Sequence, residues 1–251
     1  AAYEEKLAGI AGDYRAYYTR QRVLLFGAVL AAMFLSMFAS VQEIVKELPI
    51  YFHERFVKLQ LAPYLLSKVI PLAVLGAAQS LLLLGTIHLF SDVDAGSIVF
   101  QFPVVFMMAF VGTLLGLVIS AGVPGSKESA NIAVLLMIAV VIPQILFSGG
   151  LGPLDGFAEF LGQYLVACYW GLEALTSMIG REAPDAEEFA AFEGMGDLIG
   201  TRYWSSLLVL FGHAVLLGLL LVSFMLKKDG PEAIRKLRTG MKQIAEKAGL
   251  G

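Results

Sequence analysis

Few side chains in this sequence have the types and spacing that catalysis or metal binding requires. His53 and Glu54 could begin the H-E-x-x-H motif of zinc proteases, but position 57 is Val, so the second histidine ligand is missing. The loop from Gly122 to Lys127 has two glycines and a Ser-Lys pair, as phosphate-binding loops do. Its glycine spacing is wrong, however, and no strand precedes it. Neither motif therefore predicts a catalytic or metal site.

A second group of polar side chains lies inside long apolar stretches, where polar groups can relay protons. Its members are Ser36, Gln79, His88, Gln144 and His213. An interhelical hydrogen bond or a place near the membrane surface explains such residues more often than a relay does. No Asp or Glu lies in these stretches, although a proton-driven carrier usually has a buried carboxylate. The sequence thus indicates no catalytic residue in this chain and an energy source outside its membrane-embedded part.

Five apolar segments are long enough to cross about 30 Å of hydrocarbon as helices. They are residues 23–41, 69–90, 98–121, 130–148 and 203–226. Of the 251 residues, 58% are hydrophobic and 16% are charged, compared with roughly 25% charged residues in soluble domains. Gly112 and Gly116 form a small-xxx-small pair that favours close helix packing. The sequence therefore predicts an all-α, polytopic membrane protein with five transmembrane helices.

The segments outside these spans divide the chain further. Residues 1–21 have the pattern of an amphipathic surface helix, or of an external connection from a preceding helix. The predicted transmembrane domain is 22–228, and the odd number of spans suggests that another helix precedes it. The tail 229–251 is basic, so the positive-inside rule predicts a cytoplasmic C-terminus.

An acidic region, 151–202, precedes the last span and is predicted to be external. Its apolar stretch 157–179 is interrupted by Gly162 and Gly171 and carries several polar residues. We expect this stretch to form a re-entrant helical hairpin outside the core. The single cysteine, Cys168, lies within it, which excludes an internal disulfide and a metal site built from several cysteines.

The connection between the first two spans, residues 42–62, is rich in charged residues. Glu43 and Glu47 share one helical face. Pro49 is expected to break this amphipathic helix, and a second short helix is expected over 50–60. Charged groups avoid hydrocarbon, and the orientation places this connection in the cytoplasm. Such a segment is suited to docking another protein.

Three stretches, in this order, resemble the membrane domain of ABC-2 type exporters. They are E-I-V-K-E-x-x-I-Y-x-H-E-R from Glu43, Y-L-L-S-K from Tyr64, and I-P-Q-I-L-F-S-G from Ile142. The most similar branch is the ABCG or White type, including bacterial versions whose ATPase is fused to forkhead-associated domains. The resemblance implies that the five spans correspond to helices two to six of a six-helix domain. Residues 151–202 would then be the external re-entrant loop.

The resemblance also implies roles for individual residues. Those implied to couple the chain to an ATPase are Glu43, Glu47, Tyr51, Glu54, Arg55 and Lys68. Those implied to line a substrate pathway are Leu35, Ile142, Ile145 and Phe147. Leu151 falls at the position of an external gate.

The function implied is that of a permease that dimerises, most simply as a homodimer, in the cell (inner) membrane. ATP and Mg²⁺ would bind an ABC ATPase domain, fused or separate, rather than this chain, and nucleic acid is not an expected partner. Leu, Phe and Met dominate the first span, which favours an amphipathic or lipid-like substrate. The alternative is a non-transporting scaffold or assembly factor that binds a cytoplasmic partner through residues 43–60. An intramembrane enzyme is disfavoured because no catalytic constellation is present.

Overall fold

A computed structural model describes most of the chain. The described residues are 2–55, 60–91, 93, 96–124, 128–152, 154–179 and 198–228. Within the helices, the side chains of 2–15, Phe52, Glu54, Arg55 and 198–201 lie outside this description. The tail 229–251 and the acidic stretch 180–197, for which the sequence predicts a basic cytoplasmic segment and an external loop, also lie outside it.

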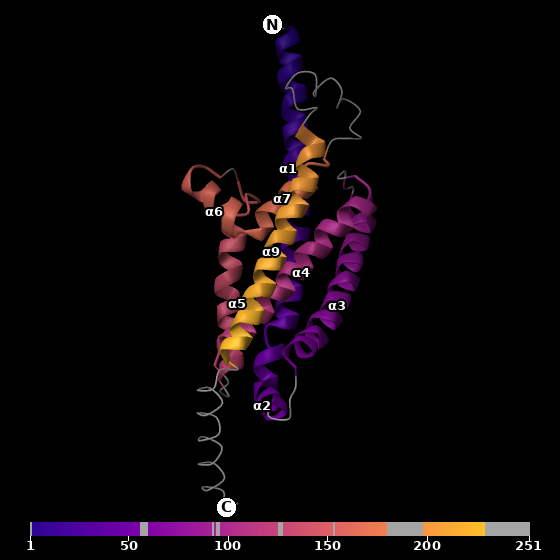
Figure 1. Cartoon of the computed structure of the whole chain (residues 1–251). Coiled ribbons are helices and arrows are strands. Elements are labelled where there is room, and N and C mark those ends of the chain that lie inside the picture. Colours follow the sequence, from indigo (N-terminus) through magenta and orange to yellow (C-terminus); the bar gives the residue numbers. More distant parts are fainter. Residues whose placement is uncertain are drawn as a thin grey trace, which may run out of the picture.

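Every regular element of the described residues is an α-helix (Figure 1). The helices are α1 (Ala2–Ser40), α2 (Glu43–Arg55), α3 (Leu61–Phe90), α4 (Ile98–Gly122), α5 (Ser129–Leu146), α6 (Phe157–Leu165), α7 (Ala167–Thr176) and α9 (Leu198–Lys228). Five of them, α1, α3, α4, α5 and α9, are long and apolar enough to cross a membrane. The predicted all-α polytopic class is confirmed.

Helix α4 forms the centre of the bundle, because it packs against α1, α3, α7 and α9. Its contact with α1 is made through glycines. A β-carbon on Gly112 would overlap the backbone carbonyl of Met33, and one on Gly116 would overlap the Ser40 hydroxyl. Only glycine therefore lets the two backbones lie this close, as in other small-xxx-small contacts.

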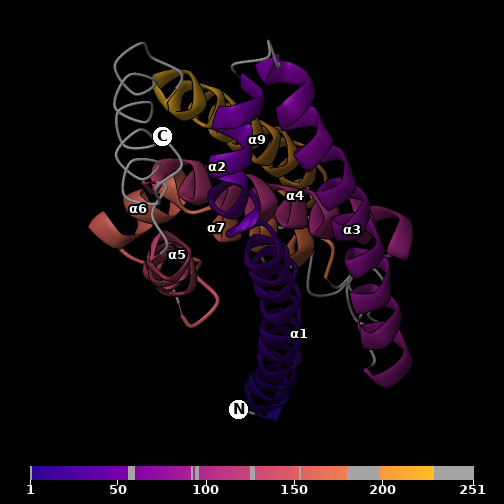
Figure 2. The ribbon, with the colours of Figure 1, turned by 90° about the horizontal axis from the view of Figure 1, so that it is seen from below.

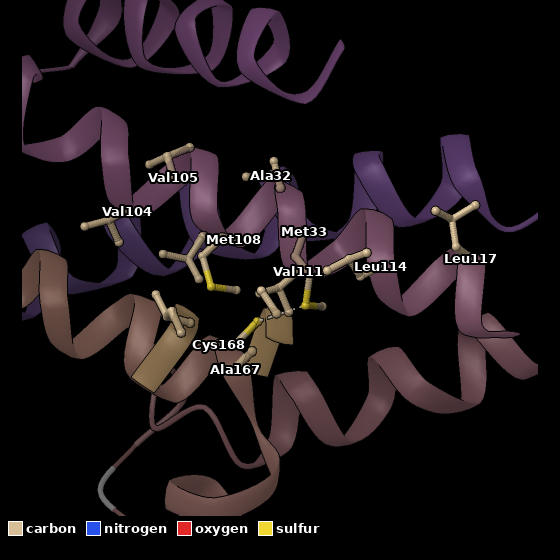
Figure 3. Close-up of a cluster of buried hydrophobic side chains, with 14 of the residues drawn as sticks. Ala32, Met33, Val104, Val105, Met108, Val111, Leu114, Leu117, Ala167 and Cys168 are labelled. Atoms are coloured by element: carbon tan, nitrogen blue, oxygen red, sulfur yellow. Dashed lines mark hydrogen bonds between the residues drawn. The ribbon is translucent and has the colours of Figure 1, made fainter. Parts of the chain in front are cut away.

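Helix α7 is part of the main core of buried side chains, so the stretch 157–179 does not lie wholly outside the core as expected. It packs against α1, α4 and α9, and the sulfur of Cys168 lies 3.6 Å from the sulfur of Met33 (Figure 3). A β-carbon on Gly171 would come within 2.6 Å of the Met108 sulfur. The glycine read in the sequence as an interruption thus allows α7 to approach α4 closely. Helix α6, in contrast, is largely exposed.

Helix α1 runs without interruption from Ala2 to Ser40. Residues 2–21 therefore belong to the same helix as the first span and do not form a separate surface helix. In Figure 1 this part of α1 projects from the end of the bundle that also carries α6.

The expected break at Pro49 is also wrong, because α2 continues through it and ends at Arg55. The chain turns earlier, at Val41 and Gln42. A proline inside a helix costs about 3 kcal/mol, whereas each large apolar side chain that becomes buried contributes about 1.5–3 kcal/mol. The fully buried residues on one face of α2 are Ile44, Leu48 and Tyr51. Burial on both sides of Pro49 therefore outweighs the missing hydrogen bond.

Candidate functional site

The first part of the candidate site is an ion-pair cluster that joins α2 to the beginning of α3. The Lys68 ammonium lies 2.5 Å from a carboxylate oxygen of Glu47 and 3.3 Å from one of Glu43. The two glutamates are one helical turn apart, so a single cation reaches both. The Lys68 side chain is 15% exposed, and the two glutamates are about 40% exposed. The cluster is therefore shielded on the lysine side and open to solvent on the carboxylate side.

An aromatic contact lies beside this cluster. The rings of Tyr51 on α2 and Tyr64 on α3 have centroids 4.6 Å apart and are inclined at 44°. Both side chains are buried. The Ser67 hydroxyl donates to the Tyr64 backbone carbonyl at 2.7 Å, a hydrogen bond within α3. Helices α2 and α3 are thus joined by charge and by packing along the same line of contact.

The N-terminus of α2 is held by a residue from a different helix. The Ser120 hydroxyl on α4 accepts hydrogen bonds from the backbone N–H groups of Ile44 at 3.1 Å and Val45 at 2.9 Å. The first N–H groups of a helix have no partner within the helix, so Ser120 acts as the cap that the local sequence does not supply. Figure 2 shows α2 lying in front of α4 at this end of the bundle.

Sequence reasoning did not identify Ser120. A serine near the end of an apolar span is common and does not by itself indicate a function. The hydrogen-bond partners of Ser120 lie 75 and 76 positions away in the chain. Only the packing of α2 on α4 gives this residue its role.

A groove opens between α2 and the beginning of α3, with a volume of about 460 Å³. Its lining residues are Glu47, Ile50, Tyr51, Pro63, Tyr64, Ser67 and Lys68. Ile50 is 59% exposed although it is apolar, and Lys46 and His53 are exposed on the same helix. The groove therefore offers an apolar surface with the Glu47–Lys68 ion pair at its side.

The structure brings together four of the six predicted coupling residues: Glu43, Glu47, Tyr51 and Lys68. Glu54 and Arg55 belong to the last turn of α2, but their side chains lie outside the described part of the structure. The structure thus combines three features. It is an all-helical membrane bundle, α2 folds back across one end of it, and a groove with apolar and charged lining lies between α2 and α3.

Comparison with known protein families agrees with this arrangement. A family model described as ABC-2 type transporter matches residues 8–179, more than half of the chain. The chain belongs to the ABC-2 type transporter family. Membrane domains of this family work with an ABC ATPase, so the chain is a permease component of an ABC transporter. No curated protein matches the chain.

In this ABC-2 type membrane domain, the predicted pathway residues fall into two pairs with different surroundings. Leu35 on α1 is 47% exposed and Ile142 on α5 is 50% exposed. Ile145 and Phe147 are partly buried and pack against the core. The first pair therefore faces outward from the single chain, toward lipid or a second copy, whereas the second pair faces the core of the chain.

The predicted gate residue Leu151 lies on the loop between α5 and α6 and is 67% exposed. This loop turns sharply at Gly149, which has a φ of +75°, a conformation that favours glycine. The Ser148 hydroxyl accepts a hydrogen bond from the Gly150 backbone N–H at 3.0 Å. The loop that carries Leu151 is thus a defined turn at the end of the bundle opposite α2.

Metal binding finds no support in the described part of the ABC-2 domain. Its described residues contain no group of three or more His, Cys, Asp or Glu that could hold a metal ion. The embedded polar residues make interhelical or local hydrogen bonds: Ser36 donates to Gln79, and the Gln144 side chain accepts from the Cys168 backbone N–H at 3.1 Å. His213 bonds to the carbonyl of Val209 on its own helix.

Proposed function

We propose that this chain is the membrane half of an exporter of the ABCG or White type, and that its ATPase docks on the groove between α2 and α3. The observation that carries the proposal is the bridge from Lys68 to both Glu43 and Glu47. This bridge holds the exposed face of α2 in a fixed relation to the first long helix after it. ATP and Mg²⁺ bind the ATPase, which is either fused to this chain, with forkhead-associated domains as in the bacterial branch, or separate.

The physical reason is that ATP can change the conformation of the spans only by favouring one state over another. That free-energy difference must pass from the ATPase into the bundle through a stiff connection. Helix α2 has three such attachments: the Ser120 cap to α4, the Lys68 bridge to α3, and the contact between Tyr51 and Tyr64. A displacement of α2 therefore has to move α3 and α4 with it.

We further propose a homodimer with the substrate pathway between the two copies. Supporting this, α1 and α5 carry exposed apolar side chains that a second copy would cover. They are Phe34, Leu35 and Phe38 on α1 and Leu135, Ile138 and Ile142 on α5. Their apolar character favours an amphipathic or lipid-like substrate that moves outward by alternating access. Leu151 then lies at the external exit.

The proposed orientation in the cell membrane places α2 and the C-terminus in the cytoplasm. Lys227 and Lys228 form the last turn of α9, and this turn lies at the same end of the bundle as α2 (Figure 1). The basic residues of the predicted tail follow directly. This distribution of positive charge supports the orientation.

The test is co-purification of the chain with the ABC ATPase expressed alongside it, for the wild type and for Ile50→Glu. A charge at the exposed apolar position of the groove should reduce the retained ATPase at least tenfold, since one buried apolar contact contributes about 1.5–3 kcal/mol. Asp155→Lys, an exposed charge change on the loop before α6, is the matched control and should retain the ATPase. Retention by Ile50→Glu at the wild-type level would contradict docking in this groove. If the ATPase binds the chain but its rate of ATP hydrolysis is the same with and without the chain, the scaffold alternative is supported instead.

A further inference from the structure

Arg22 has a charge that no described residue balances. It lies on α1 directly before the apolar run that begins at Val23. Its Nη2 donates to the backbone carbonyl of Gly149 at 2.7 Å, its only hydrogen bond in the described structure. Its Nε is buried and has no hydrogen-bond partner. Among the described residues, the guanidinium therefore has one neutral acceptor and no carboxylate partner.

The position of Arg22 is set by packing. Phe26, one turn further along α1, lies so close to Gly150 that a β-carbon there would overlap its ring. Arg22 and Phe26 thus dock one face of α1 on two consecutive residues of the turn after α5. This packing places the Arg22 guanidinium beside the Gly149 carbonyl.

The bond to Gly149 explains only part of this arrangement. The C-terminal end of a helix carries partial negative charge, which attracts a cation. Helix α5 ends at Leu146, so Arg22 lies close to such an end. This interaction with the end of α5 uses only one N–H group of Arg22. The buried Nε remains without an acceptor, and such an unsatisfied donor costs about 1–3 kcal/mol of stability. Two other cations of the described structure have carboxylate partners. Arg202, at the beginning of α9, pairs with Glu173 at 2.6 Å, and Lys68 pairs with two carboxylates.

Arg22 lies at one boundary of the apolar part of the bundle. It lies where the apolar part of α1 begins and where α5 ends, and Tyr17 and Tyr18 precede it by about one turn. Aromatic and cationic residues at such a boundary lie at the level of lipid headgroups. A phosphodiester offers several anionic oxygens, which match the fork of N–H donors on a guanidinium.

We propose that Arg22 binds the phosphate of an anionic phospholipid beside the Gly149–Leu151 turn. The lipid carries a net negative charge, because the ammonium group of a zwitterionic lipid offsets the charge of its phosphate and repels the guanidinium. The lipid stabilises the contact between α1 and the turn after α5 by balancing the charge of the guanidinium. This inference requires that the chain lies in a bilayer, but it does not depend on what the chain transports.

The experiment measures thermal stabilisation of the purified full chain in detergent by short-chain dioctanoyl phosphatidylglycerol. Dioctanoyl phosphatidylcholine and inorganic phosphate at the same concentrations are the comparison arms. Phosphatidylglycerol should stabilise the wild type with saturable binding, and the other two should bind at least tenfold more weakly. Equal stabilisation by phosphatidylcholine would overturn the proposal. Equal stabilisation by inorganic phosphate would overturn the assignment to a lipid.

Variants separate a specific site from a general charge effect. Arg22→Gln should weaken phosphatidylglycerol binding at least tenfold, which corresponds to the loss of a charge-assisted hydrogen bond. Arg20→Gln removes the same charge two residues away, at an exposed side chain, and should change binding less than twofold. Equal losses in the two variants would contradict a site at Arg22. If Arg22→Gln does not fold, the comparison of lipids on the wild type still decides the question, and Arg22→Lys provides a variant that keeps the charge.

Discussion

The Ser120 hydroxyl on α4 accepts a hydrogen bond from the backbone N–H of Val45 on α2 at 2.9 Å. The same hydroxyl accepts from the N–H of Ile44, so one side chain satisfies two of the donors at the beginning of α2. This contact lies in the buried part of the bundle. It joins the helix proposed to meet the ATPase to the central helix of the membrane domain.

Replacing Ser120 by Ala should lower the free energy of unfolding by about 1–2 kcal/mol, the usual cost of losing a helix cap. The loss arises because two buried N–H groups remain without an acceptor. Thermal or denaturant unfolding in detergent measures this change. Ser80→Ala is the matched control, since the buried Ser80 hydroxyl only donates to the Gly76 carbonyl of its own helix. A smaller loss for Ser120→Ala than for Ser80→Ala would show that the cap is unimportant.

Gly112→Ala should be strongly destabilising, by about 3 kcal/mol or more. The added methyl group overlaps the Met33 backbone, which cannot turn aside as a flexible side chain can. Melting temperature and the monodisperse fraction after purification report the effect. Gly218→Ala on α9 is the control, because nothing lies within 4 Å of a β-carbon there. This control should be neutral or slightly stabilising, given the helix propensity of alanine. Similar melting temperatures for both variants would contradict the close contact between α1 and α4.

Cys168 should not react with maleimide while the protein is folded. It is fully buried, and this burial raises the pKa of its thiol from 9.0 to about 12. The thiolate, which is the reactive form, is therefore absent at neutral and mildly alkaline pH. Leu151→Cys, at an exposed position, should be labelled rapidly in the same protein. Fast labelling of the native cysteine without denaturant would disprove the buried position of α7.

The raised pKa of Cys168 also predicts the sign of a pH effect on stability. The thiol ionises near 9.0 in the unfolded chain and near 12 in the folded one. Its contribution to the free energy of unfolding is therefore complete below pH 9 and decreases as the pH rises between these two values. Cys168→Ala should remove this part of the alkaline destabilisation, as measured by unfolding at pH 8 and pH 10. An unchanged difference between the two pH values would contradict the prediction.

The long helices were predictable because runs of apolar residues have few alternatives in a membrane. The approach of Lys68 to Glu43 and Glu47 was only partly predictable: the resemblance pointed to all three residues, but not to an ion pair between them. The expected break at Pro49 failed because local propensity was outweighed by burial of Leu48 and Tyr51. These side chains gain their neighbours only when α2 folds back on the bundle.

Helix α7 and Ser120 show a second reason why the sequence did not predict the whole structure. The polar residues and glycines of 157–179 resemble those of a surface hairpin, but Gly171 allows α7 to enter the core against Met108. Ser120 caps a helix that begins more than 70 positions earlier in the chain. In both cases the deciding contact is between residues far apart in sequence, which local patterns do not contain.

The bridge between Glu47 and Lys68 is the contact on which the coupling account depends, and exchanging its charges tests it most directly. The measurement is the ATP turnover of the co-purified ATPase, reconstituted in vesicles with the wild-type chain, with Glu47→Lys, with Lys68→Glu, or with both. Each single reversal places like charges in contact and should reduce the chain-dependent part of the turnover severalfold. The double exchange restores one cation between two carboxylates and should return turnover to within about twofold of the wild type.

The matched control is Glu173→Lys, which places a positive charge beside Arg202 at the opposite end of the bundle. This variant should change turnover less than twofold. The account predicts loss in both single variants at the α2–α3 cluster and recovery in the double variant. Wild-type turnover in both single variants, or a double variant no better than the worse single one, would contradict the claim that α2 couples the ATPase to the membrane domain through Lys68.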